Sequence, residues 1–261
     1  MSPIRFLKKG RREKQSDFLK FPLVLDVSHW EVIPDWERVS PRPALVFCKA
    51  TEGVVWRDNT FPRNWLQLAR LNIRRGAFHF WRFDHLGLRQ ADLFLNVVFQ
   101  NGCSEKDYLV LDFEPMDSRD NKGKPVSVPR GTHHAEAVKT FLDWVEEKTG
   151  QKPIIYTSRP CWEYLCDTAG LPPAWTADYL LWVAWYPHNP SLFSAPPANR
   201  IPRGWSEWAL WQYSEAGRVE GIPYDGVDLN ITSPDFARAA GIELPPQPTT
   251  SEPADAEQIT G

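Results

Sequence analysis

Two acidic residues follow an apolar segment near the middle of the chain, where residues 109–114 read Leu-Val-Leu-Asp-Phe-Glu. Side chains of a strand point alternately to its two faces, so Asp112 and Glu114 share a face. Two carboxyl groups at short range raise the pKa of one of them, which leaves one protonated and one ionised near neutral pH. Such a pair can protonate a glycosidic oxygen and stabilise the cation that forms on the sugar. A solvated strand end with two unrelated acids is the alternative interpretation.

The elements that would position this pair form a regular alternation. Strand-like, largely apolar segments lie at residues 22–27, 44–49, 76–81, 108–113, 153–157, 180–185, 208–213 and 226–229. Helical patterns separate the earlier segments, at residues 61–72, 88–100, 133–149 and 160–169. This alternation predicts parallel strands joined by right-handed crossovers. The number of strands predicts a closed α/β barrel that has lost helices in its last third.

Further acids stand at other strand ends of this predicted barrel. Asp26 ends the first strand and Asp228 ends the last one, and these two strands are neighbours in a closed barrel. Taken singly, each Asp is better explained as a loop cap or turn former. Because reactive groups of such barrels lie at strand ends, however, the set of Asp26, Asp112, Glu114 and Asp228 favours a catalytic cluster.

The composition sets the broad class of protein. With 42% apolar and 24% charged residues among 261, the chain has the composition of a globular protein with a sizeable core. The net charge of −3 argues against nucleic acid as the main partner. The cysteines lack metal or redox spacing, and no segment is long and apolar enough to span a membrane. Adjacent His133 and His134 point apart on a helix, so we expect no metal site there.

The two ends of the chain differ from the rest. Residues 1–20 carry seven Lys or Arg and two acids, a net charge of +5, whereas residues 241–261 are rich in proline and carry four acids and no base. We therefore divide the chain into a basic N-terminal arm (1–20), a barrel domain (21–240) and a Pro-rich acidic C-terminal tail (241–261). A solvated arm is the simpler interpretation, and docking to an anionic polymer, a membrane surface or a partner protein is the alternative.

Nine short motifs follow one another along the chain. They are Asp-Val-Ser-His-Trp at 26–30, Asp-Trp at 35–36, Lys-Ala-Thr-Glu-Gly at 49–53, Gly-Ala-Phe-His-Phe at 76–80, Leu-Asp-Phe-Glu-Pro at 111–115, Lys-Pro-Ile-Ile-Tyr-Thr-Ser at 152–158, Leu-Trp-Val-Ala-Trp-Tyr at 181–186, Trp-Gln-Tyr-Ser at 211–214 and Val-Asp-Leu-Asn at 227–230. In this order they resemble the glycoside hydrolase family 25 muramidases, the Chalaropsis-type lysozymes, over about residues 22–232. The resemblance implies a modified TIM-like barrel, (β/α)5(β)3, with eight strands and helices after only the first five.

The same resemblance implies an activity and its residues. The family hydrolyses the β-1,4 bond between N-acetylmuramic acid and N-acetylglucosamine in peptidoglycan, without metal or cofactor. Glu114 would be the general acid/base, and Asp112 would stabilise the developing positive charge or orient the C2 acetamido group of the substrate. Asp26 and Asp228 would shape the site and tune Glu114. The residues leave open whether the route is substrate-assisted or passes through a covalent enzyme intermediate.

Other residues in the matched motifs are candidates for substrate binding. Polar members that would bind substrate or support the acids, with ordinary packing at the barrel rim as the alternative, are Lys49, Glu52, His79, Tyr156 and Gln212. Indole rings that would floor the sugar subsites, or instead belong to the core, are Trp81, Trp185 and Trp211. One position departs from the family, which usually carries Gln where this chain has Glu31; the extra acid would alter the local field or face solvent.

Two rival functions match the sequence less well. A chitinase-like barrel requires Asp-x-x-Asp-x-Asp-x-Glu, and Val110 stands where that motif has its second Asp. A non-catalytic glycan-binding or structural component of a phage or injection particle would keep the barrel without turnover. The presence of all the acids argues against such a loss.

The N-terminal residues also bear on how the enzyme would reach its substrate. Residues 1–20 contain no apolar segment of the kind found in secretory signals. We therefore expect action at the bacterial cell wall after holin-, particle- or lysis-dependent release, as a phage endolysin or a particle-associated lysozyme. The charged ends would then dock a virion or an injection particle.

Overall fold

A computed structural model describes residues 21–33, 35–83, 86–114 and 132–244, so the basic arm and most of the acidic tail lie outside it. Its strands are β1 (Val24–Val27), β2 (Leu45–Glu52), β3 (Trp56–Arg57), β4 (Arg74–Phe80), β5 (Tyr108–Asp112), β6 (Ile154–Thr157), β7 (Leu181–Ala184), β8 (Leu210–Gly217) and β9 (Val227–Thr232). Its α-helices are α1 (Phe61–Arg70), α2 (Gly87–Gln100), α3 (Thr132–Thr149), α4 (Arg159–Trp162) and α5 (Pro234–Ala240).

The strands form a closed barrel, as predicted. They pair in the order β1-β9-β8-β7-β6-β5-β4-β2, and β1 also pairs with β2, which closes the barrel. The short strand β3 pairs antiparallel with the end of β2, at Thr51 and Glu52. The prediction of parallel strands is wrong for β9, which pairs antiparallel with both β1 and β8. The loop 218–226 explains this reversal, because a parallel return needs a crossover of a dozen or more residues.

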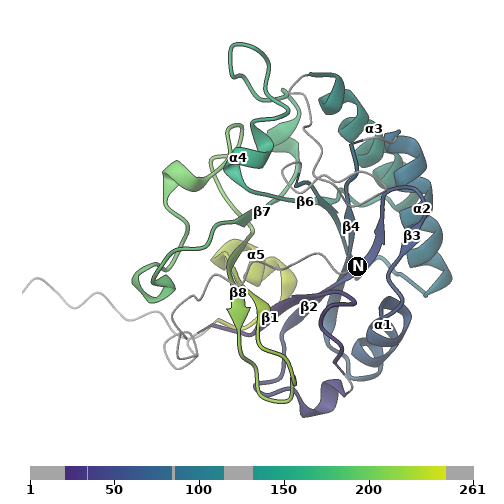
Figure 1. Ribbon diagram of the computed structural model, residues 1–261, viewed down its shortest axis with the longest axis vertical. Coiled ribbons are helices and arrows are strands. Elements are labelled where there is room, and N and C mark those ends of the chain that lie inside the picture. Colours follow the sequence, from purple (N-terminus) through teal and green to yellow (C-terminus); the bar gives the residue numbers. More distant parts are fainter. Residues whose placement is uncertain (1–20, 34, 84–85, 115–131, 245–261) are drawn as a thin grey trace, which may run out of the picture.

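Helices cover one side of the barrel and loops cover the other (Figure 1). The helices α1, α2, α3 and α4 lie between successive strands from β2 to β7, whereas the described residues between β1 and β2 form the 3-10 turn Trp36–Arg38 and no α-helix. Local capping explains where the short helices begin: Ser158 accepts a hydrogen bond from the backbone N–H of Cys161, and Ser233 accepts one from Phe236. The described part of the chain between β7 and β9 contains 3-10 turns but no α-helix.

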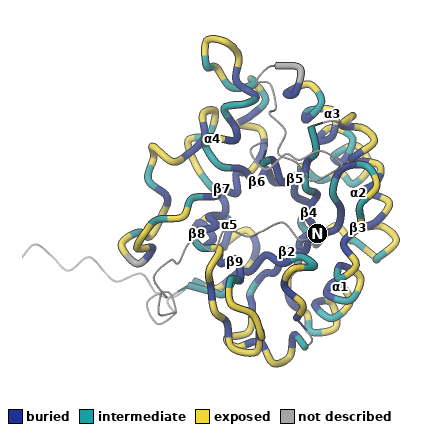
Figure 2. The backbone as a smooth tube through the Cα atoms, in the orientation of Figure 1, coloured by how far each residue is buried: buried dark blue, intermediate teal, exposed yellow. Residues whose placement is uncertain are grey.

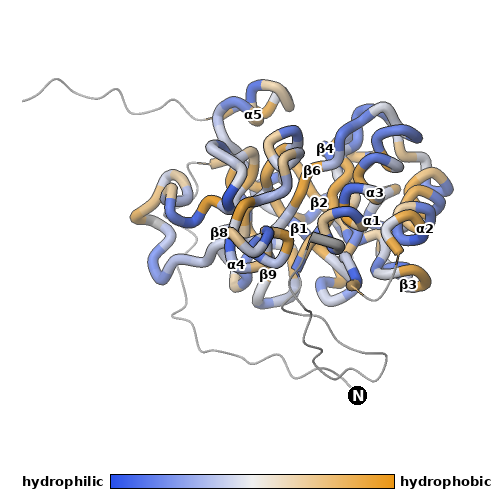
Figure 3. Tube along the Cα trace, turned by 90° about the horizontal axis from the view of Figure 1, so that it is seen from above, coloured by the Kyte–Doolittle hydropathy of each residue, from blue (hydrophilic) through white to orange (hydrophobic). Residues whose placement is uncertain are grey.

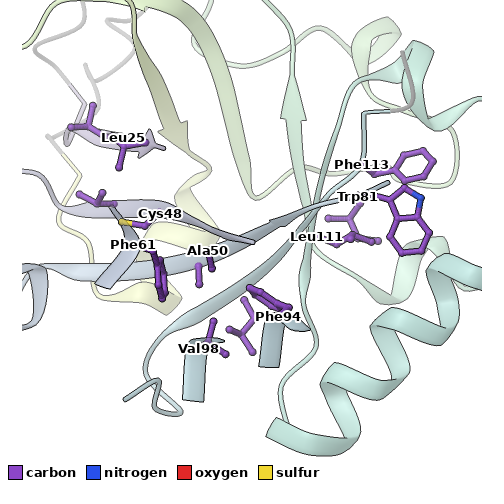
Figure 4. Close-up of a cluster of buried hydrophobic side chains, with 14 of the residues drawn as sticks. Leu25, Cys48, Ala50, Phe61, Trp81, Phe94, Val98, Leu111 and Phe113 are labelled. Atoms are coloured by element: carbon purple, nitrogen blue, oxygen red, sulfur yellow. The ribbon is translucent and has the colours of Figure 1, made fainter. Parts of the chain in front are cut away.

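Buried side chains form two layers, one inside the barrel and one outside it. Inside, the ring centroids of Phe47 in β2 and Trp182 in β7 are 4.4 Å apart. Because β2 and β7 are not adjacent in the sheet, these rings meet across the barrel. Gly76 makes room for Phe47, because a Cβ there would lie 2.4 Å from the Phe47 ring. Outside, alternate strand residues such as Cys48 and Leu111 belong to the same buried cluster as Phe94 of α2 (Figure 4). The strands are therefore buried and apolar, while the outer faces of the helices are exposed and hydrophilic (Figures 2 and 3).

The helix α5 packs against the end of the barrel at which the parallel strands begin. Phe236 lies 5.3 Å from Tyr108, the first residue of β5. The chain then continues in contact with the barrel, since Arg74 donates a hydrogen bond of 2.6 Å to the carbonyl of Gly241 and Ile242 is only 6% exposed. Residues at the start of the predicted C-terminal tail are thus part of the packed domain.

Candidate active site

The acids singled out from the sequence come together at the end of the barrel opposite α5. Asp112 is the last residue of β5 and Glu114 follows two residues later, while Asp26 is next to last in β1. Asp228 begins rather than ends its strand, yet it lies directly opposite Asp26 in the β1–β9 pair. The antiparallel direction of β9 therefore brings its start to the end of the barrel where the parallel strands finish.

Asp112 is the most perturbed of these acids. Its pKa is raised well above the ordinary value, first by burial and then by the negative charge of Glu114, with Asp26 adding to the effect and Lys49 opposing it. Its Oδ1 atom is buried and receives no hydrogen bond from the residues that the structure describes. A buried carboxyl oxygen without a donor is costly to keep, which makes it a natural contact for a bound molecule.

Asp26 is held by two amide side chains, one from the adjacent strand β9 and one from β8. Gln212 Nε2 lies 2.9 and 3.0 Å from the two carboxyl oxygens, and Asn230 Nδ2 donates a hydrogen bond of 2.7 Å to Oδ2. Burial raises the pKa of Asp26 to about 6, although its hydrogen bonds with Asn230, Gln212 and Asp228 lower it; the charge of Glu31 raises it further. The site thus contains a carboxyl group whose protonation changes near neutral pH.

Gln212 joins Asp26 to two tyrosines. The hydroxyl of Tyr156 donates a hydrogen bond of 2.6 Å to Gln212 Oε1, and the hydroxyl of Tyr186 donates to the same atom. Burial and the charge of Glu114 raise the pKa of Tyr156 well above its ordinary value, so this hydroxyl stays protonated and continues to donate. The amide of Gln212 is thereby fixed with its nitrogen toward Asp26.

The network includes residues that the sequence analysis did not select. Asn230 accepts a hydrogen bond of 2.8 Å from the indole of Trp182, which orients its amide toward Asp26. Both Asn230 and Tyr186 stand inside matched motifs, and Asn230 lies two residues after Asp228 on the same face of β9. The period of two along each strand was the signal that could have found Asn230.

Lys49 and Glu52 form an ion pair beside the acids. Lys49 Nζ lies 2.6 Å from Glu52 Oε2 and 4.5 Å from the centre of the Phe80 ring. Arg82, which the sequence analysis did not select, donates a hydrogen bond of 2.8 Å from Nε to Glu52 Oε1. Burial raises the pKa of Glu52, but Lys49 and Arg82 outweigh burial and lower it overall. Glu52 is therefore ionised and holds both cations near Asp112.

Two of the other sequence candidates, His79 and Trp81, face the layer outside the barrel. His79 is fully buried, with Nδ1 2.7 Å from Thr51 Oγ1 and Nε2 3.1 Å from the side-chain oxygen of Gln90. Burial lowers the pKa of His79 to about 4, so its ring is neutral. Trp81 is 1% exposed and lies near Leu111 and Phe113 on the helix side of the sheet (Figure 4). This placement favours the core interpretation of His79 and Trp81.

The remaining two tryptophans stack on each other. The ring centroids of Trp185 and Trp211 are 5.5 Å apart and nearly parallel, and the indole N–H of Trp211 donates to the carbonyl of Trp185. Trp211 is buried, whereas Trp185 is half-buried and has the Arg200 guanidinium 5.5 Å from its ring centre. Of this pair, only Trp185 keeps a partly accessible surface.

Glu31, the departure from the family pattern, does not face solvent. It is 4% exposed and accepts hydrogen bonds from the backbone N–H and the hydroxyl of Ser28, at 3.0 and 3.1 Å. Its charge contributes to the raised pKa of Asp26. Of the two interpretations drawn from the sequence, the structure therefore favours the one in which Glu31 alters the local electrostatic field. Among the described residues, no three His, Cys, Asp or Glu side chains are grouped in a way that could hold a metal ion.

Comparison with known families settles the class of this barrel. The family model described as glycosyl hydrolases family 25 matches residues 25–222. This chain belongs to that family. The family 25 assignment agrees with the motifs, the TIM-like barrel and the paired acids, and it makes the protein a glycoside hydrolase.

This family 25 chain is also similar to individual proteins over most of its length. It is 33% identical over 214 residues to the uncharacterized protein YegX of Escherichia coli K12, covering 79% of this chain and 68% of YegX. It is 30% identical over 221 residues to lysozyme M1 of Streptomyces globisporus, covering 82% and 68%. The crystal structure of the bacterial lysozyme from Streptomyces coelicolor matches with a TM-score of 0.71 at 29% identity, over 86% of this chain and 97% of that one. None of the helices in the described part of the chain is long and apolar enough to cross a membrane.

Proposed function

We propose that this family 25 hydrolase is a lysozyme (N-acetylmuramidase) that cleaves the β-1,4 bond between N-acetylmuramic acid and N-acetylglucosamine in peptidoglycan. The observation that carries the proposal is the pair of neighbouring acids at the end of β5, where the charge of Glu114 raises the pKa of the buried Asp112. Family membership and the likeness to lysozyme M1 support the same substrate.

In this proposal Glu114 is the general acid/base. It is half-buried and follows Asp112 by two residues, so the two carboxyl groups interact electrostatically. The negative charge of Glu114 favours a proton on Asp112, so the pair can retain a proton that Glu114 passes on. Glu114 gives that proton to the glycosidic oxygen and later takes one from the water that completes hydrolysis.

In this proposal Asp112 stabilises the positive charge that develops on the sugar. The ammonium of Lys49 favours its ionised form, and its buried Oδ1 has no donor among the described residues. That oxygen can accept a hydrogen bond from the N–H of a C2 acetamido group or face the developing cation directly. Both the substrate-assisted and the covalent route are compatible with this placement.

Asp26 and Asp228 support the pair from β1 and β9, which lie elsewhere in the barrel. The amides of Gln212 and Asn230 fix the carboxyl group of Asp26, and its charge raises the pKa of Asp112. When Asp26 ionises, Asp112 therefore binds its proton more tightly. We assign Asp26 and Asp228 a tuning role, and Lys49, Glu52, Tyr156 and Gln212 a supporting one.

The test is a mass spectrum of purified peptidoglycan after digestion, with the Glu114→Gln protein as the control. Products with reducing-end muramic acid, absent with the control, are expected. Products with reducing-end glucosamine would make the enzyme a glucosaminidase. Absence of any product would favour a non-catalytic wall-binding component.

Delivery to the wall is a separate proposal that rests on the charges of the two ends. Residues 1–20 carry a net charge of +5 and would bind an anionic wall polymer, a virion or an injection particle, as expected for an endolysin or a particle-associated lysozyme. Co-sedimentation with walls or particles should then weaken as salt increases and be lost when residues 1–20 and 245–261 are deleted. The C-terminal deletion begins after Leu244 because Ile242 is buried against the barrel. Equal binding by both forms at low and high salt would show that the ends are inert.

A further inference from the structure

Three aromatic side chains beside the acids have no role in the proposed reaction. Trp30 is 53% exposed, and its ring centroid lies 4.4 Å from that of His29. The ring of His29 lies in turn 4.9 Å from that of Trp56, and both of these side chains are half-buried. We call His29, Trp30 and Trp56 the aromatic ledge.

The aromatic ledge is continuous with the acids. His29 and Trp30 directly follow β1, which carries Asp26, and Trp56 lies opposite Glu52 in the β2–β3 pair. Lys49 Nζ lies 5.0 Å from the centre of the Trp56 ring, and the charge of the same ammonium acts on Asp112. The ledge thus begins beside the reacting groups and extends to the exposed face of Trp30.

Buried carboxyl groups hold the backbone of the aromatic ledge in place. Glu31 accepts two hydrogen bonds from Ser28, while Asp58 accepts one of 2.8 Å from the backbone N–H of His29. Asp58 Oδ2 also lies 3.1 Å from His29 Nδ1, a contact that fixes the orientation of the imidazole ring. Burying carboxyl groups is costly, and here they fix a turn that presents an exposed indole. A surface held in its binding conformation loses less entropy when a ligand binds.

We propose that the aromatic ledge is a sugar subsite, which binds a pyranose ring of the glycan chain to one side of the bond that is cleaved. The indole of Trp30 would stack on the apolar C–H face of the sugar, and the imidazole ring of His29 would hydrogen-bond to a hydroxyl group. The proposal rests on the proposed function, since the acids fix where the rest of the chain lies. The charged neighbours Lys49 and Glu52 make the rim polar, which suits a sugar better than an apolar protein surface.

Glycan binding is measured in the Glu114→Gln protein, so the test of the subsite does not depend on whether the acids have their proposed catalytic roles. Purified glycan strands, freed of peptide and fractionated by length, are titrated calorimetrically into the Glu114→Gln protein and into the same protein carrying Trp30→Ala. Loss of the stacking contact should weaken binding of long strands about tenfold. Trp30→Tyr, which keeps a stacking ring, should restore most of the affinity.

Phe99→Ala is the matched control. Phe99 is 48% exposed, close to the value for Trp30, but lies near the C-terminal end of α2, away from the acids. Its substitution should leave the affinity within about twofold. Equal binding of long strands with and without Trp30, or the same loss for Phe99→Ala, would overturn the subsite. Turnover by the Glu114→Gln protein would instead overturn the role of Glu114, and the comparison between the binding variants would still decide the subsite.

Discussion

The two faces of the barrel strands differ sharply at the end where the acids lie. On the inner face, Gln212 of β8 hydrogen-bonds to Asp26 of β1 and to Tyr156 of β6, and none of these strands are adjacent. On the outer face of the same sheet, His79 and Trp81 are packed beneath α2 and α3. A step of one residue along a strand therefore separates side chains of the proposed active site from side chains that stabilise the fold.

The strongest test of the inner face is Glu114→Gln, which keeps the shape of the side chain but removes its transferable proton. Because general acid–base catalysis contributes about 10²–10⁴-fold, kcat should fall by that factor or more. Reducing-end release from purified glycan measures kcat, and an unchanged Tm shows that folding is intact. Near-normal turnover would remove Glu114 from the mechanism.

Asp112→Asn should have the next largest effect. The substitution removes the charge that stabilises the sugar cation, so kcat should fall about 10²-fold while KM changes less. Steady-state kinetics over a range of glycan concentrations separates the two constants. A change in KM alone would make Asp112 a binding residue.

Asp26→Asn tests the inner face through pH. Since the pKa of Asp26 is raised from 3.8 to about 6 in the folded protein, the folded state favours its protonated form. That contribution to stability is complete below pH 3.8 and is lost as the pH rises through about 6. The loss of stability amounts to about 3 kcal/mol, or roughly 5 to 10 °C in Tm. The Asp26→Asn variant has no such pH-dependent loss, because Asn does not titrate.

The difference between the Tm of Asp26→Asn and that of the wild type should therefore rise from pH 4 to pH 7. Comparing the two proteins at each pH cancels the groups that they share. A constant difference over this range would mean that Asp26 is ionised in the folded protein throughout.

The smallest effect on activity is expected for Trp81→Phe on the outer face. Trp81 contacts Phe83 and Phe141 in the core, so the smaller ring should lower stability by about 1–2 kcal/mol. KM for glycan should stay within about twofold. A large rise in KM without a change in Tm would give Trp81 a sugar-binding role and remove the distinction between the two faces.

The barrel and its site were largely accessible from the sequence, because apolar segments and motifs mark the strands directly. The pairing of Asp26 with Asp228 followed from closure alone, even though the direction of the last strand was wrong. The strands expected from the sequence end at 213 and begin at 226, which leaves a gap long enough for a parallel crossover. In the structure β8 continues to Gly217, so the loop is only 218–226 and requires an antiparallel return.

Other features of the site depended on the packing of distant segments. His79 and Trp81 belong to matched motifs, but a motif does not say which face of a strand a residue occupies. Alternation from Asp112 gives the face of Glu114, whereas the bulge near Ala50 in β2 breaks such counting before Glu52. The exposure of Trp30 and the burial of Glu31 follow from a turn whose partner, Asp58, lies 29 residues after His29.

The pairing of β9 with β1 also determines when the folded, active enzyme can form. Asn230 contacts the carbonyl of Val24 across a separation of 206 residues, and Asp26 receives its amide donors from β8 and β9. Contacts between distant segments form late, because closing a long loop loses entropy before the contact is gained. A growing chain at the ribosome already contains Asp112 and Glu114, yet it lacks the strand that closes the barrel beside them. The hydrolase therefore becomes competent only after its last strand has been synthesised, which delays its action until the domain is complete.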